Sequence, residues 1–336
     1  MSVKPTVVPV FLQLLADRQL HPGALLLKAT GLAVDVSESL LQVVMHADFA
    51  AIATRLVCLM QPAQTKDWSE LQLQCLQQAG CQWLDLEKVF VSDAPTQPVL
   101  PPFALWLQGD WVTAPPGRPT ASQSTSRALA LKLVQLVAND ADTRDIEDVF
   151  RQDPALSYHL LRLVNSVGMG TSRRITSFSQ AILMLGRQQL RRWLNLMLFS
   201  ARDDDHRAAM LQARVTLRAR RLELLAKQAG LDRSDQELAF MAGMFSMLGI
   251  LFGMPLPEIF KPLQISDVLE AAVLRHEGDI GDLLRLSECA DRQDTAALRV
   301  LLVDRCITVA DFNLINLQAC HWMISVVGDP QGKTDD

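Results

Sequence analysis

The sequence is poor in aromatic residues, with one tyrosine in 336 residues and only 6% Phe, Trp and Tyr together. A chain with few aromatics that is rich in Leu and Ala favours helices over a β-sandwich. No apolar run approaches the ~18 residues of a membrane span, so we expect a cytoplasmic protein with no membrane partner. No CxxC pair occurs, which predicts buried thiols in a reducing compartment. The cysteines are Cys58, Cys75, Cys81, Cys289, Cys306 and Cys320.

Familiar catalytic motifs are also absent. The sequence has no GxSxG, HExxH or GxGxxG, and "GDPQGKT" fails as a phosphate loop because three residues, not four, separate Gly328 and Gly332. No two of the six histidines lie within one helical turn, although a metal site needs several converging ligands. The run "DDDH" at 203–206 is expected to be a solvated loop. We therefore expect no cofactor and no metal.

The residues that are present predict a well-cored globular protein, since 49% are hydrophobic and 21% charged. The charge is uneven. Between Gly170 and Gly230 there are twelve Arg or Lys and four Asp or Glu, which makes this segment +8 within a chain of net charge −5. Such a segment can form a local basic face. Binding of a nucleotide or nucleic acid by residues 170–230 is therefore kept as an alternative function.

The pattern changes near residue 112. Before it, "GALLLKA", "RLVCLM" and "QWLDLE" predict strands, and "WSELQLQCLQQAG" predicts a helix with Leu71, Cys75 and Leu76 on one face, ending at Gly80. A (β/α)₈ barrel typically needs ~250 residues, so this α/β domain, 1–112, is at most a fragment of one. Residues 113–126 form a Pro/Ser-rich linker, 127–328 a helical domain and 329–336 a disordered tail.

The helical domain resembles a known family. "IEDVFRQDPALSYHLLRLVNSVGMGTSRRITSFSQAILMLGRQQLRRWLNLMLFS" is similar to the start of an HDOD domain, the all-helical HD-related output domain of bacterial signalling proteins. The matching features include "DPAL" from Asp153, "LLRLVNS" ending at Asn165-Ser166, and "LRRW" at 190–193. The resemblance covers roughly residues 125–325. It implies a mainly α protein, with an HD-like bundle after a small α/β domain.

A second motif within the resemblance bears on catalysis. "ELAFMAGMFSMLGILFGMPLPEI" is similar to the helix that carries "HDIGK" in HD phosphohydrolases. By register, Ser246 takes the metal-binding His position and Met247 the Asp position. A hydroxyl and a thioether cannot hold a hard divalent cation or generate a metal hydroxide. The resemblance therefore implies that the chain is not an enzyme, with a residual phosphohydrolase as the disfavoured alternative.

The end of the first domain carries a weaker resemblance. "LQGDWVTAPP", with Gln108-Gly109, is similar to the last-strand exit of EAL domains, barrel phosphodiesterases that cleave cyclic di-GMP, and it directly precedes the HDOD start as in EAL–HDOD proteins. No Glu-Ala-Leu tripeptide and no Asp-Asp pair occur in the first 112 residues. Only Gln108 carries over from the family's functional positions. The resemblance implies a truncated, degenerate EAL region.

The leading hypothesis is thus a non-catalytic signal-transduction protein whose HDOD domain binds a protein partner, with a homodimer left open. Binding of cyclic di-GMP or nucleic acid is the alternative. Three surfaces are the candidates for interaction: the turn at Asn165 and Ser166, the loop at Arg173 and Arg174, and an outward helix face. That face carries Arg187, Arg191 and Arg192.

Overall fold

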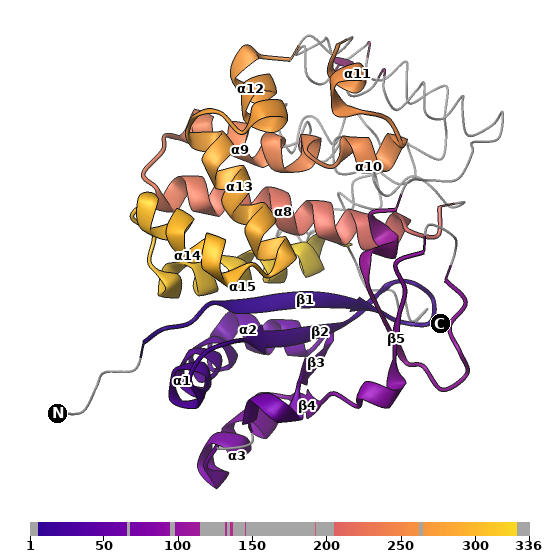
Figure 1. Cartoon of the computed structure of the whole chain (residues 1–336), viewed down its shortest axis with the longest axis vertical. Helices are drawn as coiled ribbons and strands as arrows, with labels where there is room; N and C mark the ends of the chain where they lie inside the picture. The colour runs from indigo at the N-terminus through magenta and orange to yellow at the C-terminus, as the bar shows by residue number, and fades with distance from the viewer. Residues whose placement is uncertain are drawn as a thin grey trace, which may run out of the picture.

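The structure, a computed structural model, describes residues 6–65, 68–94, 98–114, 205–261 and 265–327, together with single positions 132, 135, 136, 145 and 192. Within these residues the N-terminal part is α/β and the C-terminal part is helical (Figure 1). The strands are β1 Val10–Ala16, β2 Pro22–Ala29, β3 Val57–Met60, β4 Cys81–Trp83, β5 Val89–Val91 and β6 Trp106–Gln108.

The helices of the N-terminal part are α1 Ala33–Val44, α2 Ala47–Ala53 and α3 Glu70–Gln78, with short 3-10 turns η1 Pro62–Thr65, η2 Leu86–Lys88 and η3 Asp110–Val112. The C-terminal helices are α8 Ala208–Gln228, α9 Arg233–Phe245, α10 Leu248–Phe252, α11 Leu256–Phe260, α12 Asp267–Arg275, α13 Gly278–Arg292, α14 Thr295–Asp304 and α15 Val309–Val327. Among the described residues, none of these helices is both long and apolar enough to cross a bilayer.

The six strands form one sheet in the order β4-β3-β2-β1-β6-β5. Strand β1 is antiparallel to both of its neighbours, whereas β2, β3 and β4 are mutually parallel, as are β5 and β6. The β1–β2 hairpin follows from Asp17, whose Oδ1 accepts the backbone N–H groups of Gln19 and His21 at 2.9 Å each. This Asx-type turn fixes the register that places Leu25 and Leu27 on one face and Leu26 on the other.

The structure confirms the small α/β region and its predicted segments. Two predicted strands appear as β2 and β3, and the third, "QWLDLE", is a strand only at its start, because β4 ends at Trp83 and η2 begins at Leu86. The predicted helix appears as α3, with a capping box between Ser69 and Gln72 and with Gly80 at φ 86°. The predicted inward face is wrong in part. Leu76 is 1% exposed, but Leu71 is 70% exposed. Helix α3 lies at the margin of the sheet, so it buries a narrower stripe than its sequence offers.

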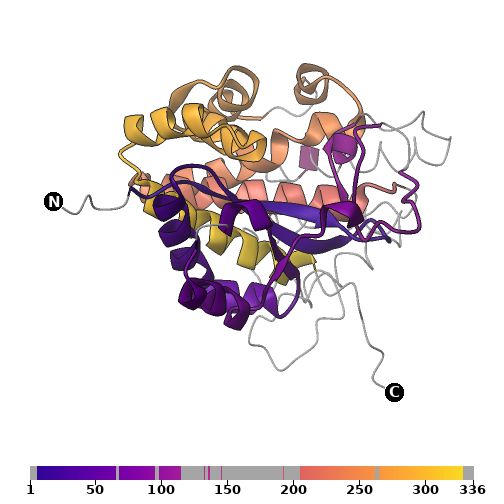
Figure 2. The same cartoon turned by 60° about the horizontal axis from the view of Figure 1, so that its bottom comes forward.

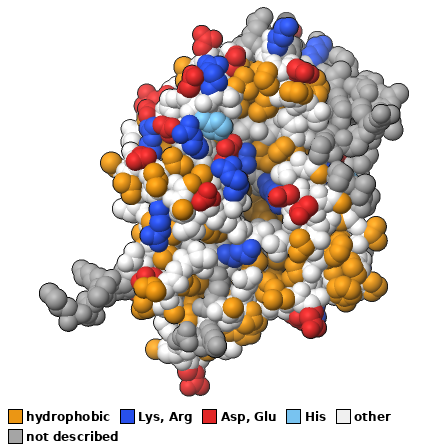
Figure 3. All heavy atoms as spheres, viewed as in Figure 1, with side chains coloured by type: hydrophobic (Ala, Val, Ile, Leu, Met, Phe, Trp, Pro, Cys, Tyr) orange, Lys and Arg blue, Asp and Glu red, His pale blue; other side chains and the backbone are white. Residues whose placement is uncertain are grey.

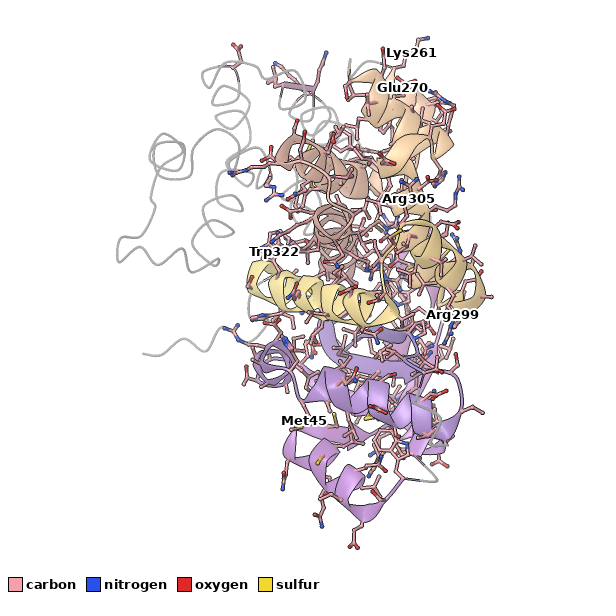
Figure 4. The ribbon with its side chains drawn as sticks, turned by 90° about the vertical axis from the view of Figure 1, so that its left-hand side faces the viewer. Met45, Lys261, Glu270, Arg299, Arg305 and Trp322 are labelled. Atoms are coloured by element: carbon pink, nitrogen blue, oxygen red, sulfur yellow. The ribbon has the colours of Figure 1, made fainter. Side chains whose placement is uncertain are left out.

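One apolar core runs from the sheet into the helices, with β1, α8 and α15 all contributing to it. Figures 1 and 2 show α15 lying between the sheet and α8. In the side view of Figure 4, α15 with its Trp322 separates Arg305 on the helical side from Met45 on the side of α1 and α2. The sheet region and the helical region are thus joined through a shared interior.

Side chains from two helices complete the free edge of β1, because β6 pairs with β1 only at Ala16. Asn313 of α15 accepts the Val10 N–H at 2.8 Å and donates to the Val8 carbonyl at 3.0 Å. Ser39 of α1 accepts the Val8 N–H at 2.9 Å. Buried backbone groups need such partners, so these side chains replace a missing strand and bind the helices to the sheet.

The residues just before α8 pack against the end of the α/β region. The expectation of a solvated loop at 203–206 is therefore wrong for Asp205 and His206. Arg207 is fully buried, bonds Asp205 at 2.7 Å and donates to the Ala114 carbonyl. The ring of His206 stacks on Trp111 at 6.1 Å, and burial lowers the pKa of His206. The chain leaving the α/β region is therefore fixed to the start of the helices.

Replacing Asn313 with Leu should lower the free energy of unfolding by about 2–4 kcal/mol, because the Val10 N–H and the Val8 carbonyl are then buried without partners. Urea denaturation of the full chain measures the change. The matched control is Leu314→Ala on the same helix, where a side chain 37% exposed should cost less than ~1 kcal/mol. Equal losses in the two variants would show that the strand edge does not depend on Asn313.

Candidate functional site

The Ser246-Met247 position lies at a break between α9 and α10. Ser246 is the C-cap of α9, and Met247, 2% exposed, precedes α10 within the core. Helix α9 packs tightly on α8 at Gly243, where a Cβ would lie only 2.7 Å from the Ala219 Cα. This close approach brings the break in α9 next to the side chains of α8.

The guanidinium of Arg218 lies beside Ser246. The Ser246 hydroxyl donates to the Gly243 carbonyl at 2.8 Å and accepts from Arg218 Nη1 at 3.0 Å. The same guanidinium donates through Nε and Nη2 to Oδ2 of Asp291, at 2.9 and 2.7 Å. Ser246 thus hydrogen-bonds to the same guanidinium that forms the Arg218–Asp291 ion pair.

Asp291 binds a second arginine, one turn further along α8. Its Oδ1 accepts from Arg221 Nη1 at 2.7 Å. Burial by itself would raise the pKa of the Asp291 carboxyl, but the guanidinium groups of Arg218 and Arg221 outweigh this and lower its pKa to about 2. The carboxylate is therefore ionised at neutral pH, with its charge satisfied by two cations of the protein.

Arg221 connects this cluster to the sheet. It is 2% exposed and donates to Ser287 Oγ at 3.1 Å and to Asn316 Oδ1 at 3.0 Å. Asn316 in turn donates to the Val10 carbonyl at 3.3 Å. A continuous set of hydrogen bonds therefore runs from α13 through α8 and α15 to β1.

A cavity of about 630 Å³ lies between the sheet and α8. Its lining includes Gln108 at the end of β6 and Met247, the two positions that the sequence singled out in separate domains. Figure 3 shows acidic and basic side chains gathered around a hollow on this face of the molecule. The fold therefore brings Gln108 and Met247 to one site, and Ser246 adjoins it through Arg218, which also lines the cavity.

Of the residues predicted to form interaction surfaces, the structure describes only Arg192. Arg192 is not outward-facing: its side chain is 16% exposed, pairs with Glu223 and lies 4.2 Å from the centre of the Phe240 ring. The remaining candidates lie outside the described residues and stay predictions. They are Asn165, Ser166, Arg173, Arg174, Arg187 and Arg191.

The sequence reasoning missed the residues that make the site. Arg214, Arg218 and Arg221 recur at i, i+4 and i+7 in "ARVTLRARR", a spacing that places them on one helix face. This spacing is a local signal for a shared helix face, whereas the net charge of the segment indicated only a basic surface. Asp291 and Lys28 carry no comparable local signal, because only the tertiary fold brings them to α8.

These residues do not fit a divalent metal. The hydroxyl of Ser246 already accepts from a guanidinium, Met247 offers a thioether, and Asp291 is committed to two arginines. Divalent cations in hydrolases require several hard or imidazole ligands. Across the ranges that the structure describes, no group of three or more His, Cys, Asp or Glu could hold a metal ion.

Comparison with protein families matches residues 125–264 to the HDOD domain, so the chain contains an HDOD domain. It is similar to "Cyclic di-GMP phosphodiesterase CdgJ" from Vibrio cholerae, with 28% identity over 59% of this chain and 46% of the relative. It is also similar to "Uncharacterized protein YuxH" from Bacillus subtilis, with 28% identity over 46% of this chain and 38% of that protein. The chain spans less than half the length of either relative.

A crystal structure of a Shewanella amazonensis SB2B protein aligns with 57% of this chain and 93% of its own length, at 17% identity and a TM-score of 0.40.

Changing Asp291 to Asn should make the protein less stable at neutral pH but not in acid. The lowered pKa of Asp291 contributes stability that is complete above the unfolded-state pKa near 4 and is lost as pH falls toward 2. Because the Asp291 side chain is 31% exposed, solvent screening limits this contribution to about 1 kcal/mol. The difference in unfolding free energy between wild type and Asp291→Asn should therefore shrink between pH 5 and pH 2.

Denaturant unfolding at several pH values measures this difference. The exposed Asp304, at the end of α14, provides the control, since Asp304→Asn should keep the wild-type pH profile. A gap between wild type and Asp291→Asn that stays constant down to pH 2 would contradict the assignment of the Arg218–Asp291–Arg221 cluster.

Proposed function

We propose that the chain is a non-catalytic bacterial signal-transduction protein that acts as a regulatory, protein-binding module through its HDOD domain. The observation that carries the proposal is the guanidinium of Arg218 beside Ser246. By the register of the resemblance, HD phosphohydrolases have a metal-binding His where this chain has Ser246. Here the Ser246 hydroxyl instead accepts a hydrogen bond from the charged side chain of Arg218. What remains for the domain is to present a surface to a partner.

The N-terminal region fits a shortened, degenerate EAL domain, and we include this in the proposal. Support comes from the parallel strand pairs and from Gln108-Gly109 at the end of β6. Gly109 has φ 118°, and a Cβ there would lie 2.2 Å from the Ser92 carbonyl oxygen, so this turn requires glycine. The relative CdgJ is named for cyclic di-GMP cleavage. Residues 1–112 of the present chain contain no Glu-Ala-Leu tripeptide and no Asp-Asp pair, whereas two-metal cleavage needs a convergent set of carboxylates.

Nucleic-acid binding by the basic segment receives less support from the side chains that the structure describes. In this segment Arg207 pairs with Asp205, Arg218 and Arg221 pair with Asp291, and Arg220 pairs with Glu223. Phosphate backbones are bound by cations that are free to release counterions. Arginines that are already paired with carboxylates of the same chain do not provide that surface, so protein binding is the better proposal.

Purified full-length protein should not hydrolyse cyclic di-GMP or a generic nitrophenyl phosphate ester with added Mg²⁺ or Mn²⁺, because the site lacks a ligand set to activate water. Product release followed by chromatography and absorbance measures this. Ser246→Ala and Met247→Leu serve as matched variants and should give the same background as wild type. Turnover that rises with protein concentration and falls in either variant would overturn the non-catalytic assignment.

Proximity labelling with the full chain in its native cell tests whether the chain binds a protein partner. We expect a protein partner whose labelling is lost in Arg173→Glu/Arg174→Glu. The control is Arg233→Glu, a side chain 83% exposed on α9, which should keep the partner. Labelling that is the same in all three proteins would show that the loop at Arg173 and Arg174 is not part of the interface.

A further inference from the structure

Helix α14 is apolar on two opposite sides, and the residues that the structure describes cover only one of them. Leu298 and Leu302, 0% and 1% exposed, face the core. On the other side Val300 and Val303 are 61% and 76% exposed, and the exposed Ala296 precedes them at the spacing i, i+4, i+7. A helix that is apolar all round is normally buried all round. The stripe of Ala296, Val300 and Val303 is therefore a surface that suits a further covering.

The position of α14 leaves this stripe accessible. Figures 1 and 4 show α14 at a margin of the helical region. Its first turn adjoins the α/β region, because the hydroxyl oxygens of Thr30 and Thr295 lie 3.4 Å apart. Leu32, which is 72% exposed, follows Thr30 by two residues. Another molecule that approached this margin would thus meet apolar side chains from both regions of the chain.

Two opposite charges flank the stripe. With 3.6 residues per turn, Arg299 and Asp304 lie on opposite sides of it, each about 70° from its centre. Among the described residues neither side chain has a hydrogen bond or an ion pair. A charged side chain at the edge of an apolar contact guides which partner binds and in which orientation. The partner that fits α14 carries an apolar stripe with the same two charges in the reverse arrangement.

A second copy of this chain provides that arrangement. When two identical helices pair in parallel about a twofold axis, the left flank of one faces the right flank of the other. Arg299 of each copy would then meet Asp304 of the other. These residues take the g and e positions of a heptad whose a and d positions are Val300 and Val303, as in parallel coiled coils. Antiparallel pairing would instead place like charges together, which is unfavourable.

From these observations we propose that α14 is a dimerisation surface, which pairs in parallel with α14 of a second copy of this chain. Val300 and Val303 form its apolar centre, and two Arg299–Asp304 ion pairs flank it. A helix of 10 residues buries less than the ~800 Å² per partner of a standard interface, so the dimer is weak, with a Kd of about 10–100 μM. The sequence left a homodimer open without a surface for it, and the inference does not rest on the regulatory role proposed above.

Sedimentation velocity of the full chain between about 5 and 500 μM tests the proposal, and should show a monomer that becomes a dimer in the range of that Kd. Val303→Asp should remove the dimer. Arg299→Glu and Asp304→Arg should each weaken it about tenfold, because two ion pairs become repulsive contacts. The double variant Arg299→Glu/Asp304→Arg restores both pairs with exchanged charges and should dimerise as wild type does. The control is Arg233→Glu, 83% exposed on α9, which should leave the dimer unchanged.

Disulfide crosslinking tests the parallel orientation. In a parallel pair Ala296 faces Ala296 of the other copy, whereas an antiparallel pair centred between Val300 and Val303 separates them by about 16 Å. The exposed Cys306 is first replaced by Ser. Under mild oxidation the variant Ala296→Cys/Cys306→Ser should then form a covalent dimer on non-reducing electrophoresis. Cys306→Ser alone should stay a single chain.

The proposal is overturned if the chain is monomeric at every concentration, or if Val303→Asp dimerises as wild type does. It is also overturned if the charge exchange does not restore the dimer, or if Ala296→Cys does not crosslink. A monomeric chain whose labelled partner in the proximity experiment is lost in Val303→Asp would assign the surface to a different protein and contradict pairing with a second copy. Circular dichroism checks that each variant folds; if Val303→Asp does not, the charge variants decide.

Discussion

A buried guanidinium, that of Arg221, is the constraint on which the rest of this structure depends. An ionised group that is 2% exposed is tolerated only when its donors are satisfied, and removing one partner from such a pair is strongly destabilising. Its partners come from two separate elements: Asp291 and Ser287 on α13 and Asn316 on α15. Because Asn316 also binds β1, the requirement of one side chain fixes the helices against the sheet.

The same cluster explains why the site differs from that of a hydrolase. Arg218 and Arg221 supply two positive charges next to one carboxylate, which holds the pKa of Asp291 at about 2. A protein cation of this kind has fixed geometry and cannot exchange or activate water as a metal does. The position around Ser246 thereby serves the architecture of the α8–α9 pair.

Local patterns predicted much of the fold and little of the site. Periodicity and terminating residues located α3 and the strands β2 and β3, because those signals lie within short windows. The Asn313 contact with β1 joins residues 303 positions apart, so no window contains it. Arg192 was expected in solvent, but it pairs with Glu223 of α8, 31 residues further along the chain. Asp205 was also expected in solvent; its partner Arg207 is a near neighbour in sequence, and only the tertiary fold buries that pair. Gln108 and Met247 were singled out from two separate motifs, and only the structure shows that both line one cavity.

Native-state hydrogen exchange at the Val10 N–H, compared with amides of α13, tests the central claim most directly. The account predicts that both exchange through the same opening in the wild type, since the hydrogen bonds from Asp291 to β1 make the sheet and helices one cooperative unit. In Arg221→Met both should lose protection by the same amount. If the Val10 N–H instead exchanges through a separate, smaller opening that Arg221→Met leaves unchanged, the sheet does not depend on the buried guanidinium, and the account is contradicted.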